Sequence, residues 1–207
     1  MHLVNLITTL AIVATSASAN LSDYLSEAVF HRFFPHANPV FTYANLVNYA
    51  TEFDQLANSG DAETDKRELA AFLAHVTRET GWLRYPEELA KNTKYAPFIG
   101  RGALQLTWDY NYKAFGDAIG QTFDRNTCTR VATQSDLIWR SAFWFWYHNG
   151  MHMFAGEANG GFAKTTRKIN GGECGRAAEK DRIQHFESYC RSFGVSPGTN
   201  LSCKPAI

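Results

Sequence analysis

Residues 67–82, RELAAFLAHVTRETGW, hold the pattern around which the rest of the chain is arranged. The apolar residues that share one helical face in this stretch are Leu69, Phe72, Leu73 and Val76. Their spacing predicts a helix with one buried side. Glu79 lies one turn past Val76, at the edge of the apolar face, and Gly81 offers the helix a C-terminal stop. A carboxyl group is therefore expected where a buried helix ends.

A polar, aromatic-rich segment follows at residues 98–112, which read FIGRGALQLTWDYNY. The apolar residues Leu104 and Leu106 alternate with the polar residues Gln105 and Thr107. Alternation of this kind predicts a short strand with two different faces.

Acidic residues stand on either side of the turn that leads to this segment, namely Glu79 and the adjacent pair Glu87 and Glu88. Hydrolysis of a glycosidic bond needs two carboxyl groups, one a neutral acid and the other an ionised base. Glu79 is expected to be partly desolvated at the rim of the apolar face, which disfavours its charged form. Glu88 is expected on a solvated turn, where it stays ionised and can activate water. The alternative is that both are solvated surface groups, as most Glu residues at helix ends are.

The composition argues against a nucleic-acid partner. The 207 residues contain 20 Lys+Arg and 20 Asp+Glu, so the formal net charge is zero and nothing favours a polyanion. Aromatic residues form 14% of the chain and can stack on sugar faces, although most Phe and Trp residues of any domain pack in the core. After the N-terminal apolar run, no segment is long and apolar enough to cross a membrane.

The N-terminal run, residues 1–19, ends in the small-residue pattern Ala-Ser-Ala. This pattern is typical of a signal-peptide cleavage site, and the run is short for a membrane span. A buried N-terminal helix is the alternative. We expect a secretory signal, a secreted protein and a single catalytic domain over residues 20–207, a length typical of one domain. Asn20 and Asn200 begin Asn-Leu-Ser sequons, which a glycosylating host can use.

Periodicity and capping residues predict helices along the whole chain. The expected spans, besides the helix that carries Glu79, are 22–34, 42–57, 111–120, 137–150, 160–169 and 177–193. Either Asp61 or Thr64 is expected to cap the helix of Glu79. The span 137–150 contains four consecutive aromatic residues, 143–146, which cannot all face the core. At least one of them must therefore face a cleft or a partner helix.

The four cysteines are Cys128, Cys174, Cys190 and Cys203. In a secreted chain an even number predicts two disulfides, and four cysteines allow three connectivities. No Cys-x-x-Cys pair and no close His partner is present, so we expect no metal site.

Several motifs occur together in a fixed order. They are AFLAHVTRETGW at 71–82, EE at 87–88, GRGALQLTWDYNY at 100–112, INGGECG at 169–175 and DRIQHFESYC at 181–190. The chain thereby resembles the chitinases of glycoside hydrolase family 19, in their short-loop bacterial-type branch, which is related to lysozyme-like phage lysis enzymes. The resemblance covers roughly Phe41 to Cys203.

The resemblance implies a mainly α, two-lobed, lysozyme-like helical domain with a small β element beside the catalytic cleft. It implies an endo-acting hydrolase that cleaves β-1,4-linked N-acetylglucosamine polymers with inversion. The expected partner is chitin or a chitooligosaccharide, without a cofactor, nucleic acid or membrane, and we expect a monomer.

The catalytic residues that the resemblance implies are Glu79, Glu88 and Thr107. The family acid is the Glu of a His-Glu-Thr motif, and here Arg78 replaces the usual His. In the bacterial-type branch the second Glu lies nine residues on, which selects Glu88 over Glu87. Thr107 matches a Ser or Thr that helps to hold the attacking water, because a hydroxyl can both donate and accept.

Four residues match sugar-binding positions of the family, namely Gln105, Tyr110, Asn111 and Asn170. Amides suit this role, since an acetamido group needs both a donor and an acceptor. Glu173 and Arg182 resemble a charge network behind the second Glu, in which an arginine that bridges two carboxylates keeps Glu88 ionised. Arg101 is expected to be a structural ion-pair partner.

In the family the cysteine of INGGECG pairs with one near the C-terminus, which implies a disulfide between Cys174 and Cys203. Cys128 and Cys190 are then left to pair with each other. Family members commonly carry a cysteine-bridged loop after the second Glu, whereas this chain has only KNTKYAPF before GRG. A short cleft with fewer sugar subsites is expected.

Two alternatives remain open beside a secreted chitinase. One is a muramidase that cleaves peptidoglycan with the same Glu, Glu and Thr set. The other is a sugar-binding or structural protein without catalytic activity, against which the retention of both carboxylates and Thr107 argues.

Overall fold

The computed structural model describes residues 20–53, 56–91, 94–159 and 161–204. The expected signal segment, residues 1–19, lies outside the described residues. So do residues 54–55 of the expected helix 42–57 and the first residue of the expected helix 160–169.

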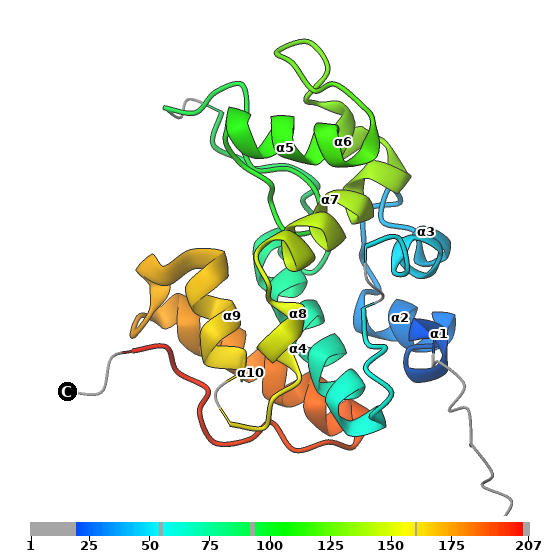
Figure 1. Cartoon of the computed structure of the whole chain (residues 1–207), viewed down its shortest axis with the longest axis vertical. Coiled ribbons are helices and arrows are strands. Elements are labelled where there is room, and N and C mark those ends of the chain that lie inside the picture. The colour runs from blue at the N-terminus through cyan, green and yellow to red at the C-terminus, as the bar shows by residue number, and fades with distance from the viewer. Residues whose placement is uncertain (1–19, 54–55, 92–93, 160, 205–207) are drawn as a thin grey trace, which may run out of the picture.

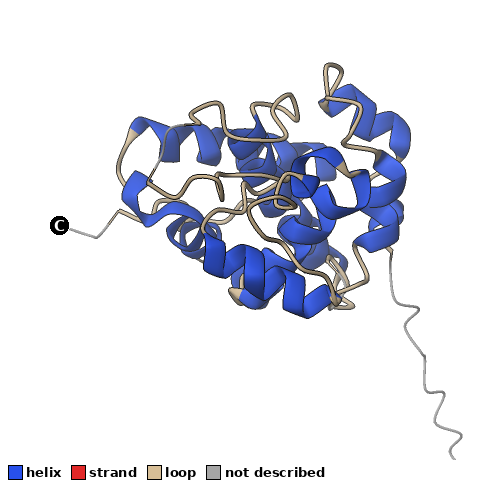
Figure 2. Ribbon diagram, turned by 90° about the horizontal axis from the view of Figure 1, so that it is seen from above, coloured by secondary structure: helices blue, strands red, loops and turns tan. Residues whose placement is uncertain are grey.

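The described residues fold into helices joined by turns and loops (Figures 1 and 2). The helices are α1 (Leu21–Tyr24), α2 (Glu27–Phe33), α3 (Tyr43–Tyr49), α4 (Ala62–Thr80), α5 (Asp109–Ile119), α6 (Arg130–Thr133), α7 (Ser135–His148), α8 (His152–Ala155), α9 (Gly161–Asn170), the 3₁₀ helix η1 (Gly171–Glu173) and α10 (Ala177–Phe193). None of the helices in the described part of the chain is both long and apolar enough to cross a membrane.

Helix α4 is the buried centre of the fold. Asp61 caps it by accepting a 2.9 Å hydrogen bond from the Thr64 amide, and Gly81 ends it in the left-handed conformation at φ 56°. The sequence predicted one buried side, but residues 67–77 are all buried. This part of the helix is therefore covered on every side. Helix α10 packs along it (Figure 1).

The buried apolar residues divide into two clusters, and each cluster is the core of one lobe. The large lobe is built around α4, and its core runs from Leu21 on α1 to Phe193 on α10. The small lobe contains α5 and α6, and its core comprises Leu106, Tyr112, Phe115, Phe123, Cys128, Val131, Leu137 and Trp144. The mainly helical, two-lobed prediction is therefore confirmed.

Helix α7 contributes to both lobes. Phe143 stacks on Phe72 of α4 with ring centroids 5.4 Å apart, whereas Trp144 belongs to the small-lobe core. The loop before α5 also attaches to α7, because the Ala103 amide donates to the Ile138 carbonyl at 3.0 Å. A methyl group on Gly102 would overlap Ser141 Oγ, so this close approach requires glycine.

The first two expected helices are shorter than predicted. The span 22–34 divides into α1 and α2, because the Ser26 side chain accepts from the Val29 amide and starts a new helix. Helix α3 ends at Tyr49, although the prediction ran to residue 57. Beyond it Ala57 takes φ 58°, and its amide donates to the buried carboxylate of Glu68 at 3.1 Å.

The predicted strand at 104–107 is wrong. The chain reverses between Arg101 and Leu106, whose amides and carbonyls pair with each other at 2.7 and 3.1 Å. Gln105 adopts φ 51° inside this reversal, which leaves no room for an extended run. The small β element that the resemblance implied is reduced here to isolated bridges, Glu87 with Arg101 and Arg101 with Leu106.

One of the two expected disulfides is present. Cys174 is joined to Cys203, as the family resemblance implied. The pairing of Cys128 with Cys190 is wrong, since both are free, buried thiols. They cannot meet because Cys128 packs in the small-lobe core, whereas Cys190 packs on α10 in the large-lobe core.

Candidate active site

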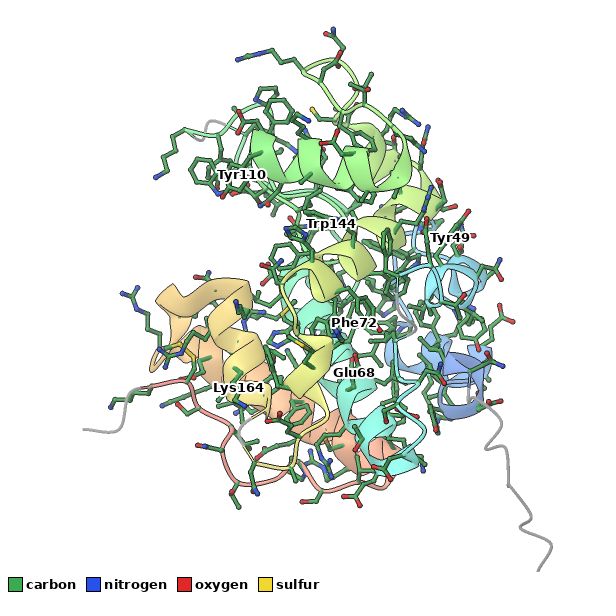
Figure 3. The ribbon with its side chains drawn as sticks, viewed as in Figure 1. Tyr49, Glu68, Phe72, Tyr110, Trp144 and Lys164 are labelled. Carbon is green, nitrogen blue, oxygen red and sulfur yellow. A yellow bond between two sulfur atoms is a disulfide. The ribbon has the colours of Figure 1, made fainter. Side chains whose placement is uncertain are left out.

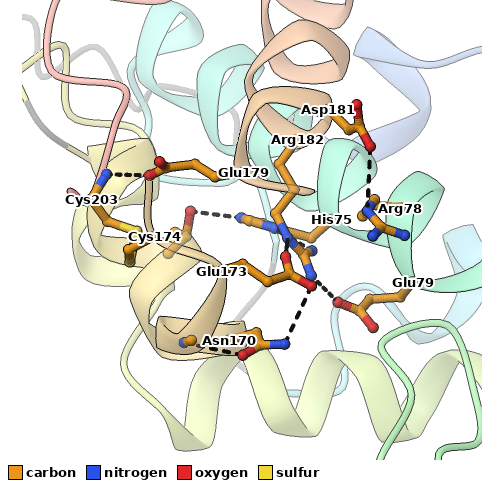
Figure 4. Close-up of polar contacts among 12 residues, drawn as sticks. His75, Arg78, Glu79, Asn170, Glu173, Cys174, Glu179, Asp181, Arg182 and Cys203 are labelled. Atoms are coloured by element: carbon orange, nitrogen blue, oxygen red, sulfur yellow. Dashed lines mark hydrogen bonds and ion pairs between the residues drawn. A yellow bond between two sulfur atoms is a disulfide. The ribbon is translucent and has the colours of Figure 1, made fainter. Parts of the chain in front are cut away.

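A cleft of about 810 Å³ lies between the end of α4, the loop that follows it, the start of α5 and the end of α9. Seven of the residues selected from the sequence line it, namely Glu79, Glu88, Gln105, Thr107, Tyr110, Asn111 and Asn170. The fold therefore brings together residues that span 91 positions of the chain. Glu173 and Arg182 do not line the cleft. Arg182 contacts both Glu173 and Glu79 (Figure 4).

Glu79 occupies the last turn of α4 and is bound from behind by Arg182 of α10 (Figure 4). The Arg182 side chain is only 1% exposed, and its Nη2 donates to Glu79 Oε1. Its Nε donates to Glu173 Oε2 at 2.7 Å. Burial by itself lowers the pKa of Arg182, but the two carboxylates outweigh burial and raise it.

This network corrects one prediction. Glu173 and Arg182 were expected behind Glu88, but they hold Glu79 instead. The physical reason is the packing of α10 along α4, which brings Arg182 to the last turn of α4 and not to the loop of Glu88. Asn170 joins the network by donating to Glu173 Oε1 at 3.3 Å, so it connects the cleft wall to the charges behind it.

The network continues inward to His75, one turn before Glu79 on α4. Arg182 Nη1 donates to His75 Nδ1 at 3.1 Å, and His75 Nε2 lies 2.8 Å from Thr165 Oγ1 of α9. The ring is fully buried, and burial together with the Arg182 charge lowers the pKa of His75 well below its usual value. The histidine is therefore neutral at ordinary pH.

Glu88 is held by two residues of the loop between α4 and α5. Its Oε1 accepts from the Tyr95 hydroxyl at 3.0 Å and its Oε2 from the Gly100 amide at 3.2 Å. The Tyr95 ring packs on Trp108 with centroids 4.9 Å apart, which fixes the hydroxyl. One oxygen of Glu88 is thus oriented by Tyr95 of the short segment KNTKYAPF, and the other by Gly100 of the GRG motif that follows it.

Glu87 has different partners from its neighbour. It pairs with Lys91 at 2.8 Å and with Arg101 at 3.3 Å. Burial opposes the charged form, yet the two cations lower the pKa of Glu87. The expectation that Arg101 is a structural ion-pair partner is confirmed.

Thr107 stands on the cleft wall in a strained segment. Its hydroxyl donates to the Gln105 carbonyl at 2.8 Å, so the oxygen lone pairs stay available as acceptors. The Asn111 amide donates to the Thr107 carbonyl at 2.9 Å and ties α5 to the same wall. Gln105 and Trp108 both have positive φ, at 51° and 76°, a strain that is often stored at functional sites.

Other aromatic residues complete the cleft. Tyr110, which is 61% exposed, comes from the first turn of α5 on the small lobe (Figure 3). Phe145 of α7 also lines the cleft, whereas Phe143, Trp144 and Trp146 are buried. The prediction that at least one of these four aromatics faces a cleft is confirmed.

Sequence reasoning missed several residues of this site, among them Tyr95, Tyr85, Trp108 and His75. Tyr95 lies in a polar segment without periodicity, so no pattern indicated it. Tyr85 lines the cleft from the turn after α4. His75 left a usable signal, because it is a titratable residue on the buried side of the helix, four residues before Glu79.

Comparisons with known proteins agree on one family. The family model described as "Chitinase class I" matches residues 84–153. The chain is 40% identical over 152 residues to an endochitinase of Arabidopsis thaliana, an alignment that covers 67% of this chain and 52% of that protein. The chain spans only 52–62% of the length of several curated relatives that it matches.

Solved structures give the same result over nearly their whole length. The family GH19, class IV chitinase from Zea mays is 32% identical, with a TM-score of 0.78, and the match covers 87% of this chain and 98% of that one. Chitinase C from Streptomyces griseus HUT6037 is 34% identical, with a TM-score of 0.75, and the match covers 86% and 96%.

Proposed function

The chain belongs to the chitinases of glycoside hydrolase family 19, and on this premise we propose that it hydrolyses β-1,4-linked N-acetylglucosamine polymers internally and with inversion. The observation that carries the proposal is the meeting of Glu79, Glu88 and Thr107 in one cleft. Glu79 comes from the end of a buried helix, and the other two come from the loop that follows it. An acid and a base on separate supports are what an inverting hydrolase needs.

The surroundings of Glu79 support its assignment as the general acid. Arg182 donates to both Glu79 and Glu173, which fixes the two carboxyl groups relative to each other. Glu173 also accepts from Asn170, whereas Glu79 lines the cleft. Glu79 is therefore the member placed to give a proton to a substrate. It gives the proton to the glycosidic oxygen as the bond from that oxygen to the anomeric carbon breaks.

The bonding of Glu88 supports its assignment as the general base. Each of its oxygens accepts a hydrogen bond, which is the pattern of an ionised carboxylate. An attacking water can donate one hydrogen to Glu88 and the other to Thr107 Oγ1, whose own hydrogen is engaged by the Gln105 carbonyl. The free lone pair of the water then attacks the anomeric carbon on the face opposite the leaving oxygen, and Glu88 takes up the released proton.

The polar lining supports an uncharged amino-sugar substrate. Gln105, Asn111 and Asn170 present side-chain amides along the cleft. Asn111 and Asn170 each keep an amide hydrogen and an acceptor lone pair for an acetamido group. Gln105, whose Nε2 donates to two backbone carbonyls, offers its oxygen as an acceptor. Tyr110 stands exposed beside Trp108, with their rings nearly parallel at 17° and centroids 6.3 Å apart. Such a surface can take the apolar face of a sugar ring.

Secretion is part of the proposal. It is supported by the apolar run at residues 1–19 and by the Cys174–Cys203 disulfide, since disulfides persist mainly in oxidising compartments. The test is N-terminal sequencing of the protein recovered from the medium of an expressing eukaryotic cell. We expect Asn20 to be its first residue. Retention inside the cell with Met1 intact would refute this part.

Release of reducing ends tests the enzymatic proposal. The wild type and Glu79→Gln are compared on chitin oligosaccharides and on peptidoglycan, with sugar binding measured by titration calorimetry. We expect the wild type to cleave chitin oligosaccharides, and Glu79→Gln to bind them with little or no cleavage, because the amide keeps the shape but has no proton to give. Cleavage of peptidoglycan alone would make the protein a muramidase. Binding without cleavage by the wild type would make it a sugar-binding protein.

A further inference from the structure

His75 is a buried histidine that the proposed reaction does not use directly. Its ring lies between Phe162, which stacks on it with centroids 5.0 Å apart, and Trp146 at 6.1 Å. It is fully buried on α4, four residues before Glu79 and therefore on the same side of the helix. A polar ring in this place needs a partner for each nitrogen.

The hydrogen-bond partners fix the tautomer of this ring. A guanidinium has only donors, so His75 Nδ1, at 3.1 Å from Arg182 Nη1, must accept and carries no hydrogen. The hydrogen of the neutral ring then stands on Nε2, which donates to Thr165 Oγ1 at 2.8 Å. The Thr165 hydroxyl in turn donates to the Phe162 carbonyl at 2.8 Å. Donation therefore runs in one direction, from Arg182 through His75 and Thr165 to the backbone.

This chain completes the bonding of Arg182. The Nε atom is bound to Glu173, Nη2 to Glu79 and Nη1 to His75, so each nitrogen of the planar guanidinium has its own partner. Because the group is rigid and planar, three partners in three directions fix both its place and its tilt. His75 is the one uncharged member of the three, so it orients the arginine without competing for its charge.

We propose that His75 is a positioning residue for the reaction: as a neutral acceptor it fixes the orientation of Arg182 and, through it, the carboxyl group of Glu79. Loss of the acceptor leaves a buried N–H of Arg182 without a partner and lets the guanidinium turn. The carboxyl of Glu79 then moves relative to the glycosidic oxygen. Small displacements of this kind can reduce turnover by roughly 10²-fold.

The variants His75→Phe and His75→Asn separate this role from core packing. Phenylalanine keeps an aromatic ring between Phe162 and Trp146 but offers no acceptor, whereas the asparagine oxygen can occupy the place of Nδ1 without the ring. We expect kcat on a chitin oligosaccharide to fall by roughly 10²-fold in His75→Phe with KM nearly unchanged, because the loss is confined to the transition state. We expect His75→Asn to regain most of that loss although it packs less well.

Phe162→Leu is the matched control, because it disturbs the ring stacked on His75 and leaves both nitrogens bonded. It should lower the unfolding temperature and keep kcat. A wild-type kcat in a folded His75→Phe, or an equal loss of kcat in His75→Asn and His75→Phe, would overturn the inference.

A second measurement does not depend on the folding of any variant. Nitrogen-15 NMR of the wild type should find His75 neutral at pH 6, with the hydrogen on Nε2 and a bare Nδ1. A hydrogen on Nδ1, or a charged ring, would equally refute the proposal. The inference rests on the proposed role of Glu79, and Glu79→Gln separates the two. If Glu79→Gln retains turnover, the assignment of the acid fails, whereas an inactive Glu79→Gln beside an unaffected His75→Phe refutes only the role of His75.

Discussion

At the residue scale, Glu87 and Glu88 are adjacent in the chain and yet face different surroundings. Both line the cleft, but Glu88 accepts hydrogen bonds from Tyr95 and a backbone amide, whereas Glu87 pairs with Lys91 and Arg101. We expect Glu88→Gln to lower kcat by about 10²–10⁴-fold, the usual contribution of a general base. Glu87→Gln should keep kcat and cost about 1 kcal/mol of stability or less, because the Glu87 side chain is 38% exposed and the glutamine oxygen can still accept from the buried Arg101. Initial rates on a chitin oligosaccharide and urea unfolding of both variants measure this. The reverse order of rates would move the base to Glu87.

His75 also makes stability depend on pH. In the unfolded chain its pKa is about 6.5, whereas burial and Arg182 lower the pKa of His75 in the folded protein. Below pH 6.5 the unfolded state therefore binds a proton that the folded state does not. The contribution of His75 is complete above pH 6.5 and is lost as the pH falls towards the folded pKa, by at most about 1.4 kcal/mol per pH unit.

Urea unfolding at pH 7 and pH 5 measures this effect. The wild type should lose more stability between the two values than His75→Asn, which has no group that titrates at this position. Equal losses in the two proteins would mean that His75 is protonated to the same extent in the folded and unfolded states.

The residues of the cleft were largely predictable, and their partners were not. Glu79, Glu88 and Thr107 stand in short motifs, so local sequence is enough to select them. Arg182 lies 103 positions after Glu79, and only the packing of α10 on α4 decides which carboxylate it meets. Sequence patterns on α10 indicate which face is buried, but they carry no record of what lies opposite. For this reason Arg182 and Glu173 were expected behind Glu88, whereas Arg182 contacts Glu79.

At the element scale, the disulfide fixes η1 to the C-terminal segment. Cys174 and Cys203 are 29 positions apart, and cross-linking a loop of this size stabilises a fold by about 3–4 kcal/mol. Replacing both residues by serine should lower the free energy of unfolding by about this amount. Glu179 still holds the two segments together through the amides of Gly175 and Cys203, so the variant should remain folded at room temperature.

Thermal unfolding with and without reductant checks this expectation. Reductant should lower the unfolding temperature of the wild type and leave the double variant unchanged. Peptide mapping of the unreduced protein should join Cys174 to Cys203 and find Cys128 and Cys190 as thiols. A linked peptide that contains Cys128 or Cys190 would contradict the pairing.

Helices with strong end signals were predicted well, and weakly bounded segments were not. Helix α4 between Asp61 and Gly81, α5 before Gly120 and α10 before Gly194 end at glycines in the left-handed conformation, which a sequence displays directly. The split between α1 and α2 depends on whether Ser26 caps a new helix or stays inside an old one. Apolar alternation at 104–107 could not reveal that the chain reverses there, since a turn and a strand share that pattern over so few residues.

At the scale of the whole molecule, the stereochemistry of the product tests the arrangement of the cleft. If Glu88 activates water and does not attack the sugar itself, the two carboxyl groups should stand roughly 6.5–9.5 Å apart, against about 5–5.5 Å in a retaining pair. The first product from a β-linked substrate should then be the α-anomer. Proton NMR in the opening minutes of hydrolysis, before mutarotation, distinguishes the two anomers. An initial β-anomer would remove the water-holding role of Thr107 together with the inverting mechanism.

Helix α7 contacts both walls of this cleft. It packs against α4, which carries Glu79, the proposed acid. Its Ile138 carbonyl accepts from the Ala103 amide and so anchors the loop that leads from Glu88, the proposed base, to Thr107. Because a single helix contacts both walls, it sets the distance between Glu79 and Glu88 independently of the loops that cover the cleft. Shorter covering loops should then weaken the binding of long polymers, while the relative positions of Glu79 and Glu88 are kept. A shortened enzyme built around such a helix should lose affinity for long polymers before its kcat falls.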